Sequence, residues 1–234
     1  KETEIFVIWD DHDYGLNDGG SDYRYKIQSQ KLFNDFWDIK QNDLRRQRDG
    51  IYFSETKIIQ NQKILFLGLD TRFFRSQLTK SNNAYVVNSD SEATILGNEQ
   101  WIWLENELSK PHDILILASS IQVLATEHRF EKWSNFPHER KKLLSLLEDL
   151  SSHVVLLSGD RHRGGIYQYG DIVEITASSL NRGIFPSYET DKLLLGETHP
   201  QNNYGLIEIE KDKLSIFLKD EHMQPLESFI MPLK

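Results

Sequence analysis

Short apolar runs alternate along this chain with longer amphipathic stretches. Runs of branched and aromatic residues that end at polar residues are typical of strands. The runs are Ile5–Trp9, Ile51–Ile59, Lys63–Leu69, Ile114–Leu117, Val154–Leu157, Ile166–Tyr169, Ile172–Thr176, Leu206–Glu210 and Leu214–Leu218. The second and third of these are joined at Asn61-Gln62 and predict a hairpin.

Three segments repeat their apolar residues at the spacing of a helix with one buried face. They are Phe33, Phe36 and Trp37 within residues 27–39; Trp101, Leu104 and Leu108 after Gly97-Asn98; and Leu143, Leu144, Leu147 and Leu150 after Pro137. The last helix leads directly into the strand at Val154, as in a βαβ unit. Residues 78–96 lack a regular period and predict a surface loop. The order of elements indicates an α/β protein whose final third is mainly β.

Composition narrows the class of protein. A chain of 234 residues suits one domain, residues 1–234, that buries roughly 70% of its unfolded surface. No stretch is long and apolar enough to predict a transmembrane segment. The net charge of −9 argues against a broad nucleic-acid-binding surface, which needs basic residues facing phosphates. The chain has no cysteine, so it offers neither a disulfide nor a thiolate ligand.

Two polar blocks follow predicted strands and carry the candidate chemistry. Asp10-Asp11-His12-Asp13 comes after the first strand, and Gly159-Asp160-Arg161-His162 follows the strand at Val154. Ligands of open α/β sheets lie at such strand ends, and so many carboxylates together are unfavourable unless cations lie among them. Either block alone is equally consistent with a polar turn. Together they predict a metal-dependent enzyme.

The motifs resemble, in order along the chain, those of the PhoD-like alkaline phosphatases, which belong to the calcineurin-like metallophosphoesterases. The matching segments are Trp9 to Gly15, Leu69 to Arg72, Leu96 to Trp101, Ser119 to Leu124, Glu131 to Arg140 and Ser158 to His162. The resemblance implies an α/β sandwich of β-sheets flanked by helices. It also implies a phosphomonoesterase or phosphodiesterase that uses a metal-activated hydroxide on a phosphoester substrate.

The resemblance assigns roles to the two polar blocks. Asp11 matches a metal ligand, and His12 matches the histidine that acts on the leaving-group oxygen, with Asp13 orienting its imidazole. Asp160 and His162 match ligands of different metals. The family's cluster typically holds Fe³⁺ with Ca²⁺, which would place His162 at the iron; by donor type, Zn²⁺, Mn²⁺ or Mg²⁺ would also fit.

Other polar residues have two interpretations. Arg72 and Arg161 have the fork geometry that binds phosphate, but each is equally suited to a structural ion pair. Tyr14 and Asn17 either line the substrate pocket or shape the turn at Gly15. Four other histidines have no partner at a recognisable spacing and are interpreted as surface or structural groups. They are His128, His138, His199 and His222.

The chain also departs from the family pattern. The family's first two blocks, which supply a cysteine, a bridging aspartate and a tyrosine ligand, are not visible in it. We therefore expect an N-terminal segment preceding Lys1 to complete the site; the alternative is an inactive remnant. Family members are often exported, so the resemblance implies an extracytoplasmic location. Two other function classes stay open: a related metal-dependent hydrolase such as a phospholipase or sulfatase-like enzyme, and a non-catalytic scaffold.

Overall fold

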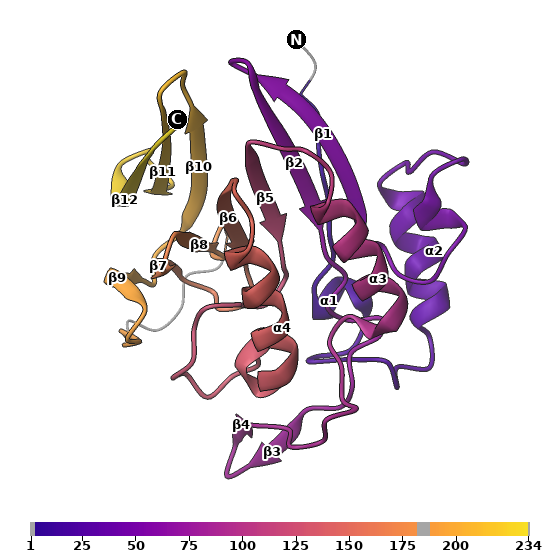
Figure 1. Cartoon of the computed structure of the whole chain (residues 1–234). Helices are drawn as coiled ribbons and strands as arrows, with labels where there is room; N and C mark the ends of the chain where they lie inside the picture. The colour runs from indigo at the N-terminus through magenta and orange to yellow at the C-terminus, as the bar shows by residue number, and fades with distance from the viewer. Residues whose placement is uncertain (1–2, 182–187, 234) are drawn as a thin grey trace.

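The computed structural model describes residues 3–181 and 188–233. Within these residues, seven strands form a central sheet in the order β1-β2-β5-β6-β8-β7-β9 (Figure 1). Their bounds are β1 Phe53–Ile59, β2 Gln62–Gly68, β5 Ile114–Ala118, β6 His153–Ser158, β7 Gly164–Tyr169, β8 Ile172–Ala177 and β9 Leu194–His199. Strands β2, β5, β6 and β8 run parallel, while β1, β7 and β9 pair antiparallel with their neighbours.

Helices α3, Gly97–Leu108, and α4, Pro137–Glu148, cover one face of this sheet (Figure 1). Alternate residues of β2, β5 and β6, among them Leu65, Leu115 and Leu156, pack with Leu104 of α3 and Leu143 of α4. Side chains of a strand alternate between its two faces, so the intervening residues point to the other side. Helix α4 begins as the sequence predicts, with Pro137 in its first turn. Helix α3 begins earlier than predicted, so that Gly97 and Asn98 lie in its first turn and Leu96 is at the N-cap.

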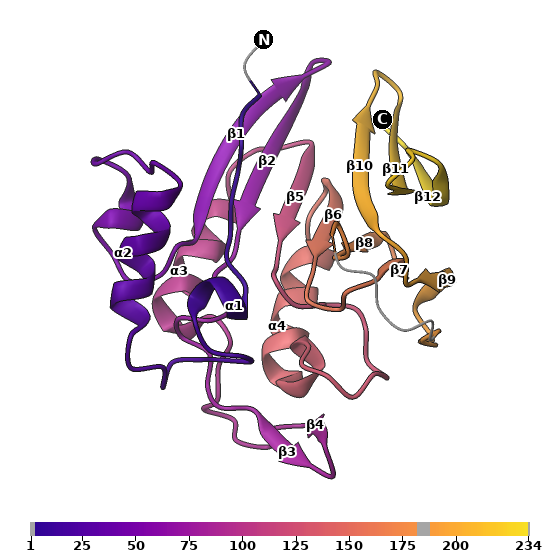
Figure 2. The same cartoon turned by 180° about the vertical axis from the view of Figure 1, so that it is seen from behind.

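A second, three-stranded sheet packs on the opposite face, as the view from behind shows (Figure 2). It contains β10 Asn203–Ile209, β11 Lys213–Asp220 and β12 Pro225–Pro232, all antiparallel. Ile114, Val155 and Val173 of the central sheet meet Leu214 and Ile216 of β11 in a buried core. Two sheets thus form a sandwich, with helices on its outer side.

The remaining elements connect or cover this framework. They are α1 Asp11–Tyr14, α2 Lys26–Phe36, the 3-10 helices η1 Leu44–Arg46 and η2 Trp133–Asn135, and the small hairpin of β3 Thr79–Ser81 and β4 Ala84–Val86. The hairpin lies in the segment predicted as loop, where its strands are too short to produce a visible period. Strands β9 and β12 were not predicted either. No helix of the described residues is long and apolar enough to cross a membrane.

The predicted strand at Ile5–Trp9 is wrong. Residues 3–10 pair with no strand, and the chain then turns into the one-turn helix α1. Its apolar side chains pack instead of its backbone pairing: the Phe6 ring lies 5.9 Å from Phe53 and 5.3 Å from Phe66, centroid to centroid. The segment therefore lies over the sheet (Figure 2), and its apolar pattern reflects that contact.

Candidate metal centre and substrate pocket

The loops that follow the parallel strands converge at one edge of the sheet. Parallel strands place their carboxyl ends at the same edge, where ligands of α/β proteins bind. Here β2 leads to Asp70 and Arg72, β6 leads to Asp160, and α1 packs beside them (Figure 1). A pocket of about 1140 Å³ opens between these loops. It is lined by Asp10, Asp11, His12, Asn17, Asp18, Glu127, His128, Arg129, Phe130, Asp160, Arg161, His162, Arg163, Tyr188, Glu189 and Thr190.

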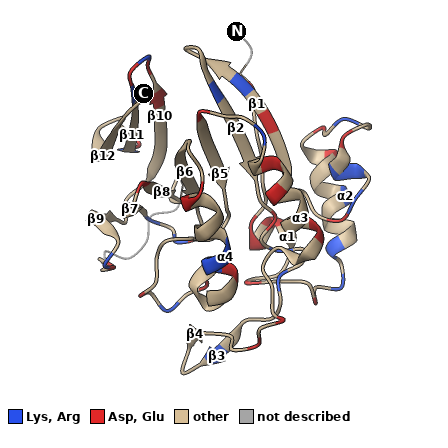
Figure 3. Ribbon diagram, in the orientation of Figure 1, with Lys and Arg blue, Asp and Glu red and all other residues tan. Residues whose placement is uncertain are grey.

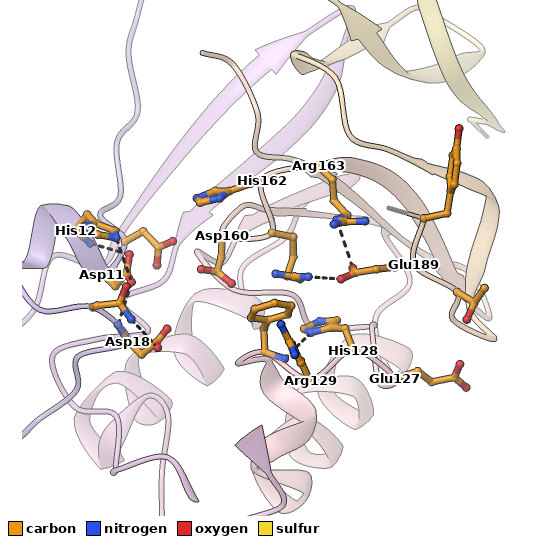
Figure 4. Close-up of a pocket in the computed structure, with 16 residues that line it drawn as sticks. Asp11, His12, Asp18, Glu127, His128, Arg129, Asp160, His162, Arg163 and Glu189 are labelled. Atoms are coloured by element: carbon orange, nitrogen blue, oxygen red, sulfur yellow. Dashed lines mark hydrogen bonds and ion pairs between the residues drawn. The ribbon is translucent and has the colours of Figure 1, made fainter. Parts of the chain in front are cut away.

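One side of the pocket is acidic, and α1 carries part of this charge (Figures 3 and 4). Carboxylate oxygens of Asp10, Asp11 and Asp160 all lie within 4.8 Å of one another. Asp11 shares a second such group with Asp18 and Glu131. Asp11 is fixed by two backbone donors, since its Oδ1 accepts from the His12 N–H at 2.7 Å and its Oδ2 from the Asp18 N–H at 2.9 Å.

The backbone of the β6 loop is held in an uncommon conformation. Asp160 has φ 65° and His162 has φ 50°, both in the left-handed region that side chains with a Cβ rarely adopt. Burial first, and then repulsion from Asp10 and Glu131, raises the pKa of Asp160 well above its ordinary value. Backbone strain of this kind clusters at binding sites, and Asp160 is aimed at the other carboxylates (Figure 4).

The buried guanidinium of Arg72 joins two carboxylates of the acidic side, those of Asp10 and Glu131. Arg72 is fully buried, and its Nε donates to Asp10 Oδ1 at 2.9 Å. Its NH2 group also pairs with Asp10, and lies 2.5 Å from Oε1 of the buried Glu131. Arg75 lies 3.7 Å from the other Glu131 oxygen and donates to the Gly19 carbonyl at 2.7 Å. The acidic blocks are thus fixed to the loop after β2 by ion pairs out of water.

Asp70 shapes that loop. Its carboxylate accepts hydrogen bonds at 2.9 Å from the N–H groups of Ile51, Arg72 and Phe73 and from Trp9 Nε1. Burial raises the pKa of Asp70, and these four donors oppose the shift. The bond from Trp9 brings the segment before α1 to the end of β2, which explains how that segment reaches the site without strand pairing.

The opposite side of the pocket is basic and aromatic (Figure 4). The guanidinium of Arg161 lies 4.0 Å from the centre of the Phe130 ring and pairs with Glu189. Arg163 Nε lies 3.5 Å from the second oxygen of Glu189. Next to them, the His128 ring lies 6.2 Å from that of Phe130. We call Arg161, Arg163, Phe130 and Glu189 the cationic wall.

The donors of the acidic side fit a metal ion. Carboxylate oxygens are the ligands preferred by Ca²⁺, Mg²⁺ and Mn²⁺, and an imidazole also suits Zn²⁺ and iron. Three carboxylates within 4.8 Å repel one another, and a cation among them would remove that repulsion. Asp10, Asp11 and Asp160 can hold at least one divalent cation. His162 lines the same pocket but belongs to neither group of potential ligands within 4.8 Å.

Most residues singled out from the sequence meet in this pocket. They are Asp11, His12, Asn17, Asp160, Arg161 and His162. The His12 side chain is largely exposed, and its Nε2 lies 4.0 Å from Asp11 Oδ2. The structure brings the two sequence blocks together as expected, while the role of each residue stays a prediction.

Three of the singled-out residues are placed differently. Tyr14 is fully buried against Trp9 and donates its hydroxyl to the Gly20 carbonyl at 2.8 Å, so it shapes the turn and does not line the pocket. Arg72 forms the structural ion pairs described above. Asp13 is exposed and accepts a 3.5 Å hydrogen bond from the Asp10 N–H, and the carboxylate next to the His12 ring belongs to Asp11.

Other site residues were missed from the sequence. Glu131 and Asp18 stand isolated in the sequence, and only the fold places them beside Asp11. His128 was read as a surface or structural histidine, but it lines the pocket. Phe130 and Glu189 carry no motif. Of these residues, Glu131 alone lies in a segment whose sequence resembles the family, Glu131 to Trp133, and that resemblance assigns it no role.

His128 gives a pH-dependent prediction. Burial, reinforced by Arg161 and Lys132, lowers its pKa to about 2, against about 6.5 in an unfolded chain. Below pH 6.5 the unfolded chain binds a proton that the folded chain does not, so stability falls as the pH decreases. Between pH 7.5 and 5.5, the free energy of unfolding should fall about 1 kcal/mol more in wild type than in His128→Asn, measured by urea unfolding. Equal pH dependence in the two proteins would contradict a neutral His128.

Comparison with solved structures supports the fold. The chain is similar to "Structure of PhoD" with a TM-score of 0.69 and 17% identity, over 97% of this chain and 51% of that one. It is also similar to GAP50, described as the anchor in the inner membrane complex of Plasmodium, with a TM-score of 0.56 and 14% identity, over 79% of this chain and 54% of that one. The chain thus spans about half the length of these proteins. At such identities the likeness shows the fold, which is the predicted metallophosphoesterase type.

Sequence comparison gives the family. No curated protein sequence matches the chain. The sequence model of the PhoD-like phosphatases matches residues 1–215, which is most of the chain and includes both polar blocks. The protein belongs to the PhoD-like phosphatase family.

Proposed function

We propose that the protein hydrolyses phosphoesters with bound metal ions. The observation that carries this proposal is the group of Asp10, Asp11 and Asp160, with carboxylate oxygens within 4.8 Å, in a pocket that His12 and His162 also line. Family membership supports phosphate chemistry at that place. Carboxylates gathered at the carboxyl ends of parallel strands are well placed to hold cations against a phosphoryl group.

In this mechanism residues of the chain hold the metal ions, orient the catalytic histidine and protonate the leaving group. Asp11, Asp160 and His162 would hold metal ions, whose chemistry is to activate water and neutralise phosphoryl charge. His12, exposed at the pocket, gives a proton to the leaving-group oxygen. Asp11 orients it, because its carboxylate lies 4.0 Å from Nε2 and accepts the His12 backbone N–H. Asn17 contacts the substrate from the same side.

The finer parts of the proposal follow from the family resemblance. We propose Fe³⁺ and Ca²⁺ as the ions and an extracytoplasmic location for the protein. We also propose that a segment outside residues 1–234 supplies further ligands. A two-metal site holds its ions about 4 Å apart through shared donors, and the ligands that we assign within the chain are Asp11, Asp160 and His162.

Fold alone does not assign the activity. A solved structure of the same fold is described as an anchor, so a non-catalytic role for the scaffold is the alternative class. A related hydrolase acting on phospholipids or sulfate esters is the second. A panel of aryl phosphate monoesters, aryl phosphate diesters and aryl sulfates, assayed with iron and calcium present, separates these three functions.

Asp160→Asn tests the metal-dependent activity. Loss of a direct ligand should lower kcat for an aryl phosphate at least on the order of 100-fold, the upper end of the effect of residues that only support ligands. Asp171→Asn, in the exposed turn between β7 and β8, is the matched control and should retain wild-type kcat. If both variants hydrolyse the ester as the wild type does, the site is not the one that we propose.

His12→Gln tests the acid. A leaving group of low pKa departs without a proton, whereas an alkoxide needs one. For an alkyl phosphate, the kcat of the variant should fall on the order of 100-fold. For 4-nitrophenyl phosphate, the fall in kcat should be smaller by a factor of at least about ten. His222→Gln, in the exposed turn between β11 and β12, provides the control. A loss independent of the leaving group would show that His12 has another role.

A further inference from the structure

The pocket has two sides of opposite charge, and the proposed chemistry uses only one. The acidic side contains Asp10, Asp11, Asp18 and Asp160. Across the same pocket lies the cationic wall, Arg161, Arg163, Phe130 and Glu189 (Figure 4). In a chain whose net charge is −9, a wall of this sign is a specific local feature.

The two arginines of the cationic wall are buried and are held in place by neighbouring side chains. Arg161 and Arg163 are each only 5% exposed, although both line the pocket. The Phe130 ring, 4.0 Å from the Arg161 guanidinium, fixes its plane by a cation–π contact. Glu189 receives both guanidiniums, one on each carboxylate oxygen. A planar fork held in this way is suited to bind an anionic group.

Within the four residues of the cationic wall, two cations face one carboxylate, and Glu127 lines the same pocket. Two buried guanidiniums share the single carboxylate of Glu189. Lys132 lies behind them, with its amine donating to the carbonyls of His128 and Phe130 at 2.6 and 3.0 Å. Burial first, and then repulsion from Arg161, lowers the pKa of His128 and of Lys132, the latter to about 8. Arg161 thus adds positive potential at both groups, and Asp191 and Glu189 oppose it at Lys132.

The size of the pocket leaves room for a second group. Its volume of about 1140 Å³ exceeds the range of roughly 300–1,000 Å³ that holds drug-sized ligands. A phosphoryl group at the acidic side fills a small part of that space. The pocket thus has room for the alcohol portion of a phosphoester bound there, and the cationic wall lines this further space.

We propose that the cationic wall is a subsite for a second anionic group, a carboxylate or a phosphate, on the alcohol portion of the substrate. Arg163 and Arg161 bind that group. Phe130 keeps the Arg161 guanidinium in its orientation, and Glu189 partly neutralises the two guanidiniums. The protein thus favours doubly anionic phosphoesters over neutral ones of the same shape. This inference rests on the proposed function for the placement of the scissile phosphate.

Equilibrium binding tests the subsite without turnover. Three phenylphosphonates differ only at the para position, which carries a carboxylate, a second phosphonate or a neutral carboxamide. Each is titrated into the calcium-loaded full chain by calorimetry. The wild type should bind at least one anionic ligand about tenfold more tightly than the carboxamide, as a charge-assisted hydrogen bond provides. The stronger of the two anions identifies the group that the wall selects.

Two variants of opposite sign separate the subsite from general damage. Arg163→Gln should reduce the ratio of anionic to neutral affinity about tenfold, while Glu189→Gln, which keeps the shape and removes the negative charge, should increase it severalfold. Arg24→Gln, an exposed arginine on the segment before α2, should leave the ratio at its wild-type value.

The outcomes are distinct. A ratio near one in the wild type, no binding of any of the three ligands, or a change in the same direction in Arg163→Gln and Glu189→Gln would overturn the subsite. A normal preference in a protein that hydrolyses no phosphoester would overturn the proposed function and leave the subsite standing. Hydrolysis of phosphoesters without a preference for the anionic ligands would overturn the subsite and leave the proposed function standing.

Discussion

The site depends on a guanidinium that is wholly removed from water. Burial alone would lower the pKa of Arg72, but Glu131 and Asp10 raise it above its usual range, so the group stays charged. A buried charge is tolerated only when it is paired and hydrogen-bonded. Arg72 therefore fixes the position of two carboxylates from distant parts of the chain, one beside α1 and one before η2. The segment before α1 is held at the sheet by this ion pair, by the hydrogen bond from Trp9 to Asp70 and by the packing of Trp9 and Phe6.

The same constraint sets the electrostatics of the pocket. Arg72 and Arg75 form ion pairs with Glu131. The carboxylates on the acidic side of the pocket are Asp10, Asp11, Asp18 and Asp160. These lie against a wall where two guanidiniums share one carboxylate. Under the proposed function, a phosphoester carrying a second negative charge would meet metal ions at one end of the pocket and arginines at the other. The division of charge is a property of the loops, because the strands below them are apolar on both faces.

Sequence patterns predicted the framework of this fold and the two polar blocks that meet at the pocket. The hairpin of β1 and β2, the strands β5 and β6, and the helices α3 and α4 follow from apolar runs and helical spacing because each buries a strong, regular face. Ile5–Trp9 misled because an apolar segment that packs over a sheet has the composition of a strand without its pairing. For Arg72 and Tyr14 the sequence left two interpretations open, because burial depends on contacts more than fifty residues away for Arg72 and on a tight local turn for Tyr14. Glu131, Phe130 and Glu189 could not be found, since no spacing in the sequence shows which loops meet.

Binding of a divalent cation to the chelator-stripped protein tests the central claim most directly. The account predicts saturable binding of Ca²⁺ or Mn²⁺ by calorimetry in the wild type, and a loss of that binding in Asp11→Asn, because Asp11 belongs to both groups of carboxylates. Asparagine can keep only one of the two backbone hydrogen bonds to Asp11, because its amide nitrogen cannot accept the other. Circular dichroism must therefore show that the variant is folded before its binding is compared with that of the wild type. If neither ion binds saturably, or if Asp11→Asn binds as the wild type does, the acidic side is a structural cluster and not a metal centre.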